Sequence, residues 1–145
     1  MTAGPSAEEV LLGNLKQRLP ALEALLERAG SDWEYEDYVY RFYHQSFKVF
    51  GVQSLTLQIV AALRELLPGT PLNDSFVAII DAGTGRKFTL EMNAVWDAST
   101  RPLLEAFFHA RFMLEMAVKY GRELEKPPTM LPSGWAALLY LYGLR

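Results

Sequence analysis

The stretch Trp33–Phe50, WEYEDYVYRFYHQSFKVF, decides how this chain folds. It contains eight aromatic side chains: Trp33, Tyr35, Tyr38, Tyr40, Phe42, Tyr43, Phe47 and Phe50. At about 100° per residue, they cover more than half of the circumference of a helix. A helix that is apolar on so many sides normally packs against several neighbours. The stretch therefore predicts a central aromatic helix over residues 32–50, opened by a capping box at Ser31 and Glu34 and ended by Gly51.

A second long helix is predicted over residues 100–120. Ser99 or Thr100 caps it, Pro102 fits in its first turn, and Gly121 follows its end. The periodic apolar residues of the remaining segments indicate shorter helices around these two. The fold class is therefore all-α, with about six helices packed as a bundle in one domain that covers residues 1–145.

The shorter helices are placed by their caps and breaks. Ser6 and Glu9 form a second capping box, Pro20 ends or kinks the helix that follows, and Gly30 stops it. The other predicted helices are one after Ser54 or Thr56 that ends before Pro68, a short one after Asn73 or Asp74 that ends before Gly83, and one over Trp135–Tyr142, capped by Ser133 and stopped by Gly143. The last is so apolar that it must dock, either on its own core or on another chain.

Residues 76–92 also fit a β-hairpin. Phe76 to Ile80 is rich in strand-forming residues, and Lys87 to Met92 alternates between polar and apolar side chains. We favour helix–loop–helix here, because an isolated hairpin is only marginally stable and no other segment offers a third strand.

Composition limits the possible functions. Half of the residues are hydrophobic, 21% are charged and the net charge is −3. Without a basic run, nucleic acid is not an expected partner. The longest apolar stretch is about eight residues, which is too short to span a membrane, and Met1–Val10 is too polar for a signal peptide. The absence of cysteine excludes disulfides and thiolate chemistry and is typical of a cytoplasmic protein.

Three residues of the long helix are candidates for a ligand site. Glu105 and His109 lie one turn apart and share one side, and Arg101 lies one turn before Glu105. A structural interpretation pairs Glu105 with His109 or with Arg101. A functional interpretation makes all three a binding site. The charged residues of the adjacent arc are expected to form the solvated side of this helix: Arg111, Glu115, Lys119 and Arg122.

The aromatic helix has one narrow polar stripe. It contains Asp37, Arg41, His44 and Lys48, with Tyr40 beside them. This stripe is either a surface charge network or one wall of a cleft. In a cleft, Tyr40 and His44 would join the ligand site of Arg101, Glu105 and His109. The set Asp37, His44, Glu105 and His109 could then hold iron, manganese or zinc.

No motif identifies an enzyme. A P-loop, a His-Glu-x-x-His pair and a nucleophile elbow are all missing. We therefore predict a non-catalytic, cytoplasmic helical module that binds a protein partner or itself, most simply as a homodimer. The alternative is a metal- or small-ligand-binding protein. In its hydrolytic form His44 and His109 hold the ion, and Glu105 takes a proton from the bound water.

Overall fold

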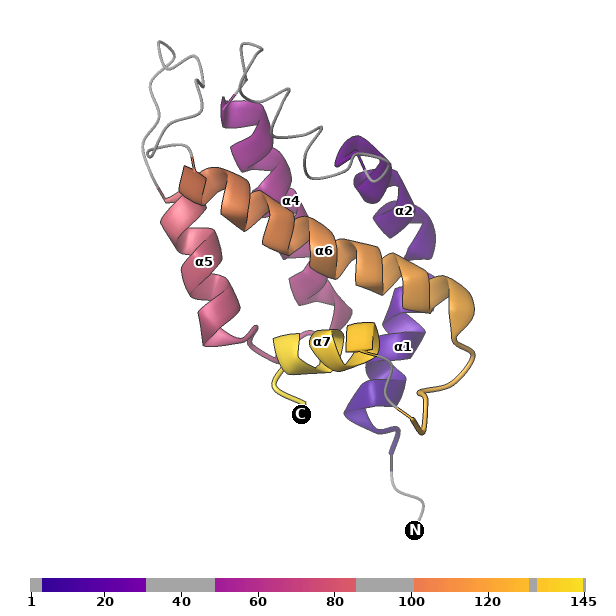
Figure 1. Ribbon diagram of the computed structural model, residues 1–145. Helices are drawn as coiled ribbons and strands as arrows, with labels where there is room; N and C mark the ends of the chain where they lie inside the picture. The colour runs from indigo at the N-terminus through magenta and orange to yellow at the C-terminus, as the bar shows by residue number, and fades with distance from the viewer. Residues whose placement is uncertain (1–3, 31–48, 86–100, 131–132, 145) are drawn as a thin grey trace.

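The computed structural model describes residues 4–30, 49–85, 101–130 and 133–144. The secondary structure within these ranges is α-helical throughout, as predicted (Figure 1). The described helices are α1 (Ala7–Gln17), α2 (Leu19–Arg28), α4 (Val49–Leu66), α5 (Asp74–Thr84), α6 (Arg101–Glu123) and α7 (Ser133–Leu141). None of them is both long enough and apolar enough to cross a membrane.

Helix α6 is the centre of the described fold. It runs diagonally across the bundle in Figure 1 and contacts each of the other described helices. Leu103, Phe107, Ala110 and Leu114 are fully buried along it. The predicted central role of the long helix is thus confirmed. The predicted aromatic helix falls almost entirely on residues 31–48, outside the described residues.

Side-chain caps start two of the helices where the sequence predicts them. The Ser6 hydroxyl accepts a hydrogen bond from the Glu9 amide at 3.2 Å, and Asn73 accepts one from the Ser75 amide at 2.9 Å. Both bonds satisfy amide groups that have no partner inside the first turn of a helix. Pro20 stands in the first turn of α2, which explains why α1 and α2 are separate helices.

The predicted boundary near Gly51 is wrong. Helix α4 already includes Val49 and continues through Gly51, Ser54 and Thr56 to Leu66. The buried Thr56 hydroxyl donates to the Val52 carbonyl at 2.8 Å, one turn back in the same helix. Its hydrogen bond is therefore satisfied in the helix interior, so Thr56 does not act as a cap.

Two further glycines were also predicted as helix ends, and both lie inside helices. Helix α5 includes Gly83, where an added Cβ would lie 2.6 Å from the Ala106 Cβ of α6. Helix α6 includes Gly121, where an added Cβ would lie 3.2 Å from Leu19. These glycines let neighbouring helices approach closely. By contrast, Gly30 and Gly143 have positive φ angles of 71° and 66° and do end their helices, as predicted.

Helix α5 occupies the residues that the hairpin alternative assigned to a first strand. Phe76 and Ile80 are buried on one side of this helix. The second half of that alternative, residues 86–92, lies outside the described residues.

The C-terminal helix α7 docks on the core of its own chain. Trp135 and Leu138 are fully buried, and the Trp135 ring packs edge-on against Tyr120 of α6 with centroids 5.7 Å apart. Gly134 lets α7 lie close to α6, because an added Cβ there would lie 2.5 Å from the Met116 sulfur and 2.8 Å from the Tyr120 hydroxyl oxygen. The sequence left open whether this helix docks on its own core or on another chain. In the structure it docks on its own core.

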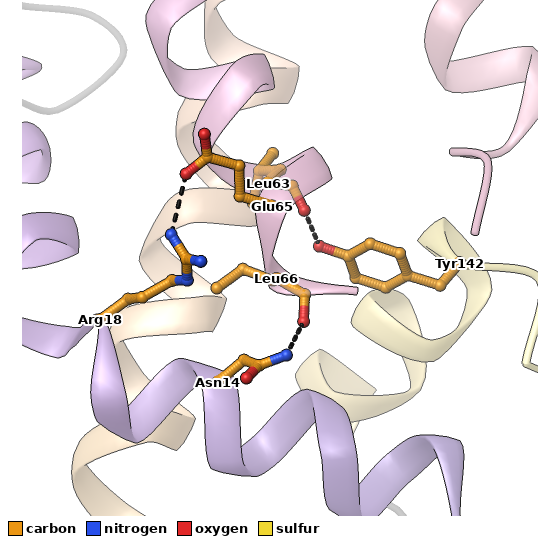
Figure 2. Close-up of polar contacts among 6 residues, drawn as sticks. All are labelled: Asn14, Arg18, Leu63, Glu65, Leu66 and Tyr142. Carbon is orange, nitrogen blue, oxygen red and sulfur yellow. Dashed lines mark hydrogen bonds and ion pairs between the residues drawn. The ribbon is translucent and has the colours of Figure 1, made fainter. Parts of the chain in front are cut away.

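Two side chains from distant parts of the sequence hold the C-terminal end of α4 (Figure 2). The Tyr142 hydroxyl donates to the Leu63 carbonyl, and the Asn14 amide donates to the Leu66 carbonyl at 2.7 Å. Arg18 and Glu65 form an ion pair at 2.8 Å beside them. The last carbonyls of a helix lack partners within it, so these bonds fix the position of α4 in the bundle.

Candidate functional site

The three predicted site residues that the structure describes lie on an exposed side of α6. The Arg101 Nε lies 3.7 Å from a Glu105 carboxylate oxygen, and the two side chains are 67% and 61% exposed. The predicted Arg101–Glu105 pair is therefore present. His109 is exposed one turn further along, and no hydrogen bond joins it to Glu105. In this exposed setting the pair contributes little to stability, because water screens both charges.

Only two of the four predicted metal ligands, Glu105 and His109, lie within the described residues. Asp37, Tyr40 and His44 lie outside the described residues. Among the described residues there is no group of three or more His, Asp or Glu side chains that could hold a metal ion. A site for iron, manganese or zinc that combines Asp37 and His44 with Glu105 and His109 stays a prediction.

The prediction that Arg111 lies on the solvated side of α6 is wrong. This side chain is only 8% exposed, and its guanidinium lies 3.1 Å from the Glu115 carboxylate, one turn further along. A buried guanidinium is costly unless it is paired, and Glu115 supplies an opposite charge for Arg111. Lys119 and Arg122 are exposed as expected. A hydrogen bond from Arg122 to Glu23 of α2, together with the charge of Glu23, raises the pKa of Arg122.

The most distinctive surface of the described chain lies on α4. From Gly51 to Ala61 its exposed positions hold no charged residue: they are Gly51, Ser54, Leu57, Gln58 and Ala61. We call these five residues the α4 face. Leu57 is 48% exposed at its middle. A shallow hollow of about 500 Å³ lies over this face, lined by Ser54, Leu57, Gln58, Ala61 and the neighbouring Gln53.

The exposed sides of the other long helices differ from the α4 face. Each carries charged residues: Glu9 and Lys16 on α1, Glu27 and Arg28 on α2, Asp74 and Asp81 on α5, and Arg101 and Lys119 on α6. Helix α7 has no charged residue, but it is largely buried. Helix α4 therefore has an exposed side without charge over residues 51–61, and its exposed charged residues, Arg64 and Glu65, lie at its C-terminal end.

A groove between α2 and α4 adjoins the α4 face. Its volume is about 410 Å³, and Ala21, Leu22, Ala24, Leu25 and Ala62 provide its apolar lining. The groove is bridged at two points. One bridge is the Arg18–Glu65 ion pair, and the other is a hydrogen bond of 2.7 Å from Arg28 to Gln58.

A larger hollow of about 570 Å³ lies between α1 and residues 125–129. Charged side chains of both signs line it, among them Glu8, Lys16, Glu125 and Lys126. It contains none of the predicted site residues, and its mixed charges select no class of ligand.

The α4 face was not identified from the sequence, although a signal for it was present. Residues 49–63 form the run VFGVQSLTLQIVAAL, which contains no charged residue. The spacing of its apolar residues predicts only which side of the helix faces the core. Comparison of the chain with protein-family models, curated proteins and solved structures found no match.

Proposed function

We propose that this chain is a non-catalytic helical module that associates with a second copy of itself through the α4 face. The observation that carries the proposal is the exposed run of uncharged side chains around Leu57. Interfaces between proteins are depleted of charged residues at their centre, because charges there lose their hydration. A solvent-exposed face without charges is unusual for a surface that stays in water.

The rigid support of α4 favours this role. Asn14 and Tyr142 hold its C-terminal carbonyls, and Thr56 and Ile59 are fully buried on the opposite side of the helix. A face presented on a fixed helix loses little conformational freedom on binding. As part of the proposal we place the module in the cytoplasm, since a chain without cysteine suits a reducing compartment.

The experiment is sedimentation velocity of the wild-type chain over a concentration series from about 1 to 500 μM, a range that covers micromolar dissociation constants. We expect a concentration-dependent dimer. Leu57→Lys should shift the chain to monomer, because two lysines would have to be buried at the symmetric contact.

Phe112→Lys is the matched control. Phe112 is 46% exposed on α6, close to the 48% of Leu57, so the same charge enters a similar environment elsewhere. This variant should dimerise like the wild type. A wild-type chain that is monomeric over the whole series would refute self-association. Loss of the dimer in the Phe112 variant, with the Leu57 variant unaffected, would move the interface to α6.

A further inference from the structure

We infer that the groove between α2 and α4 binds a small carboxylate with an unbranched apolar tail: Arg28 holds the carboxylate, and the tail lies along the groove floor. The groove adjoins the α4 face, but the inference does not depend on self-association. It follows from the apolar lining of the groove, from its length and from the charges around it.

Small side chains leave this groove open. Helix α6 packs against both α2 and α4 and so holds the two walls together. Ala21 and Ala24 of α2 and Ala62 of α4 line the groove, where longer side chains would fill it. Leu22 and Leu25 also line it and are buried, so they form its floor. A volume of about 410 Å³ with a mainly apolar lining and few polar groups is typical of small-molecule sites.

Two polar bridges limit the length of the occupant. The Arg18–Glu65 ion pair crosses the groove at one end, and the hydrogen bond from Arg28 to Gln58 crosses it at the other. Between Gln58 and Glu65, α4 rises by about 10 Å at 1.5 Å per residue. A partner helix along the groove would have to break both bridges, whereas a small molecule fits between them. An extended chain advances about 1.2 Å per bond, as a polypeptide backbone does, so a tail of about eight carbons spans this length.

Arg28 gives the groove its unmatched positive charge. Its guanidinium donates to the neutral side chain of Gln58 at 2.7 Å, and no carboxylate of the described residues forms an ion pair with it. At the other end, Arg18 and Glu65 neutralise each other at 2.8 Å. A guanidinium has five N–H donors, and the bond to Gln58 occupies one of them. Two others can therefore bind both oxygens of a carboxylate.

The remaining charged residues of the two helices do not cancel the charge of Arg28. Glu23 of α2 pairs with Arg122 of α6. Glu27 does not line the groove, and about 100° per residue places it on the far side of α2. Arg64 of α4 is exposed outside the lining and adds a further positive charge. The described residues around the groove thus attract an anion locally, although the net charge of the chain is −3.

Octanoate is the probe, and NMR locates it on the full-length ¹⁵N-labelled chain. Titration with octanoate should shift the backbone amide signals of residues 21–28 and 58–65 until they saturate. Octan-1-ol has the same tail without the charge and should bind about fivefold more weakly, which is the upper range for a solvent-exposed ion pair. Butanoate has a tail four carbons shorter and should bind at least about tenfold more weakly than octanoate, because it buries fewer methylene groups.

Matched variants separate the charge from the groove. Arg28→Gln should weaken octanoate about fivefold and leave octan-1-ol unchanged. Arg64→Gln makes the same change of charge at an exposed position outside the lining, so both affinities should stay as in the wild type. Ala24→Phe should weaken both ligands by about tenfold or more, because the ring fills the groove. Its control is Ala82→Phe, an exposed position on α5 that should have no effect.

Three results would overturn the inference. Equal binding of octanoate and octan-1-ol, unchanged in Arg28→Gln, would show that the carboxylate is not recognised. Amide shifts outside residues 21–28 and 58–65, or wild-type affinity in Ala24→Phe, would place the ligand elsewhere. The third result is no saturable shift up to about 10 mM octanoate, which is ten times a millimolar dissociation constant. The oligomeric state tests only the proposed function, so the two can fail separately.

Discussion

Tyr142 donates its hydroxyl hydrogen bond to the carbonyl of Leu63, so a residue just beyond α7 fastens the C-terminal part of α4 (Figure 2). Both residues are buried, and 79 positions separate them in the sequence. Tyr142 is thus a structural residue whose polar atom contributes to stability.

Tyr142→Phe should lower the free energy of unfolding by about 1–2 kcal/mol, because it removes one buried hydrogen bond and leaves the ring in place. Urea titration followed by circular dichroism measures the change. Tyr140→Phe is the control, since Tyr140 is 55% exposed in the same segment and its loss should be close to neutral. Equal effects of the two substitutions would contradict a specific role for the Tyr142 bond.

The same tyrosine should make the protein less stable at high pH. Burial raises the pKa of the Tyr142 phenol above its ordinary value. The folded state therefore keeps a proton that the unfolded chain releases above about pH 10. Stability should be unaffected by this group below that pH and should fall as the pH rises beyond it. Urea midpoints measured from pH 8 to 11 should decline less steeply in Tyr142→Phe than in Tyr140→Phe.

Two helical glycines should respond in opposite directions to alanine. Gly83→Ala should cost about 1–3 kcal/mol, because the new methyl group would overlap α6 at Pro102 and Ala106. Gly13 of α1 has no atom within 4 Å of an added Cβ. Gly13→Ala should therefore stabilise the protein by about 0.5–1 kcal/mol through helix propensity. Thermal unfolding of both variants decides the matter, and stabilisation by Gly83→Ala would show that α5 and α6 can separate freely.

The two acids of α6 that pair with arginines should differ in importance, because one arginine is exposed and the other, Arg111, is buried. Glu105→Gln removes a solvent-screened pair and should change the free energy of unfolding by less than about 0.5 kcal/mol. Glu115→Gln leaves Arg111 buried beside a neutral group and should cost about 2 kcal/mol or more. Chemical denaturation compares the two variants directly. A large loss of stability in Glu105→Gln would mean that this carboxylate has a structural role beyond the pair with Arg101.

The helices themselves could be predicted because their signals are local. Ser6 and Asn73 cap helices, Pro20 separates two of them, and residues at helical spacing form the core. A side-chain cap needs only a hydroxyl or amide within three residues of the first amide groups. Such a residue can be recognised directly in the sequence.

The role of each glycine could not be predicted in the same way. Gly30 and Gly143 end helices through a positive φ angle, whereas Gly83 and Gly121 lie inside helices that pack closely on others. The two roles differ only in what lies opposite the missing side chain. That neighbour comes from a distant part of the chain, so local sequence cannot distinguish a helix end from a close contact.

The candidate site shows the same limit. The pairing of Arg101 with Glu105 followed from helical spacing and is present. The burial of Arg111 and the exposure of Leu57 depend on which neighbours cover each side of α6 and α4. A helical wheel gives the angle between two side chains around the helix axis. It does not show which side of the helix faces water.

The two hydrogen bonds that Asn14 and Tyr142 donate to the C-terminal carbonyls of α4 have a consequence for the order of folding during synthesis. Asn14 is available before α4 is translated, but Tyr142 leaves the ribosome well after α4 is complete. Closing a loop of 79 residues is also slow compared with forming a helix. The end of α4 should therefore be secured only in the last stage of folding.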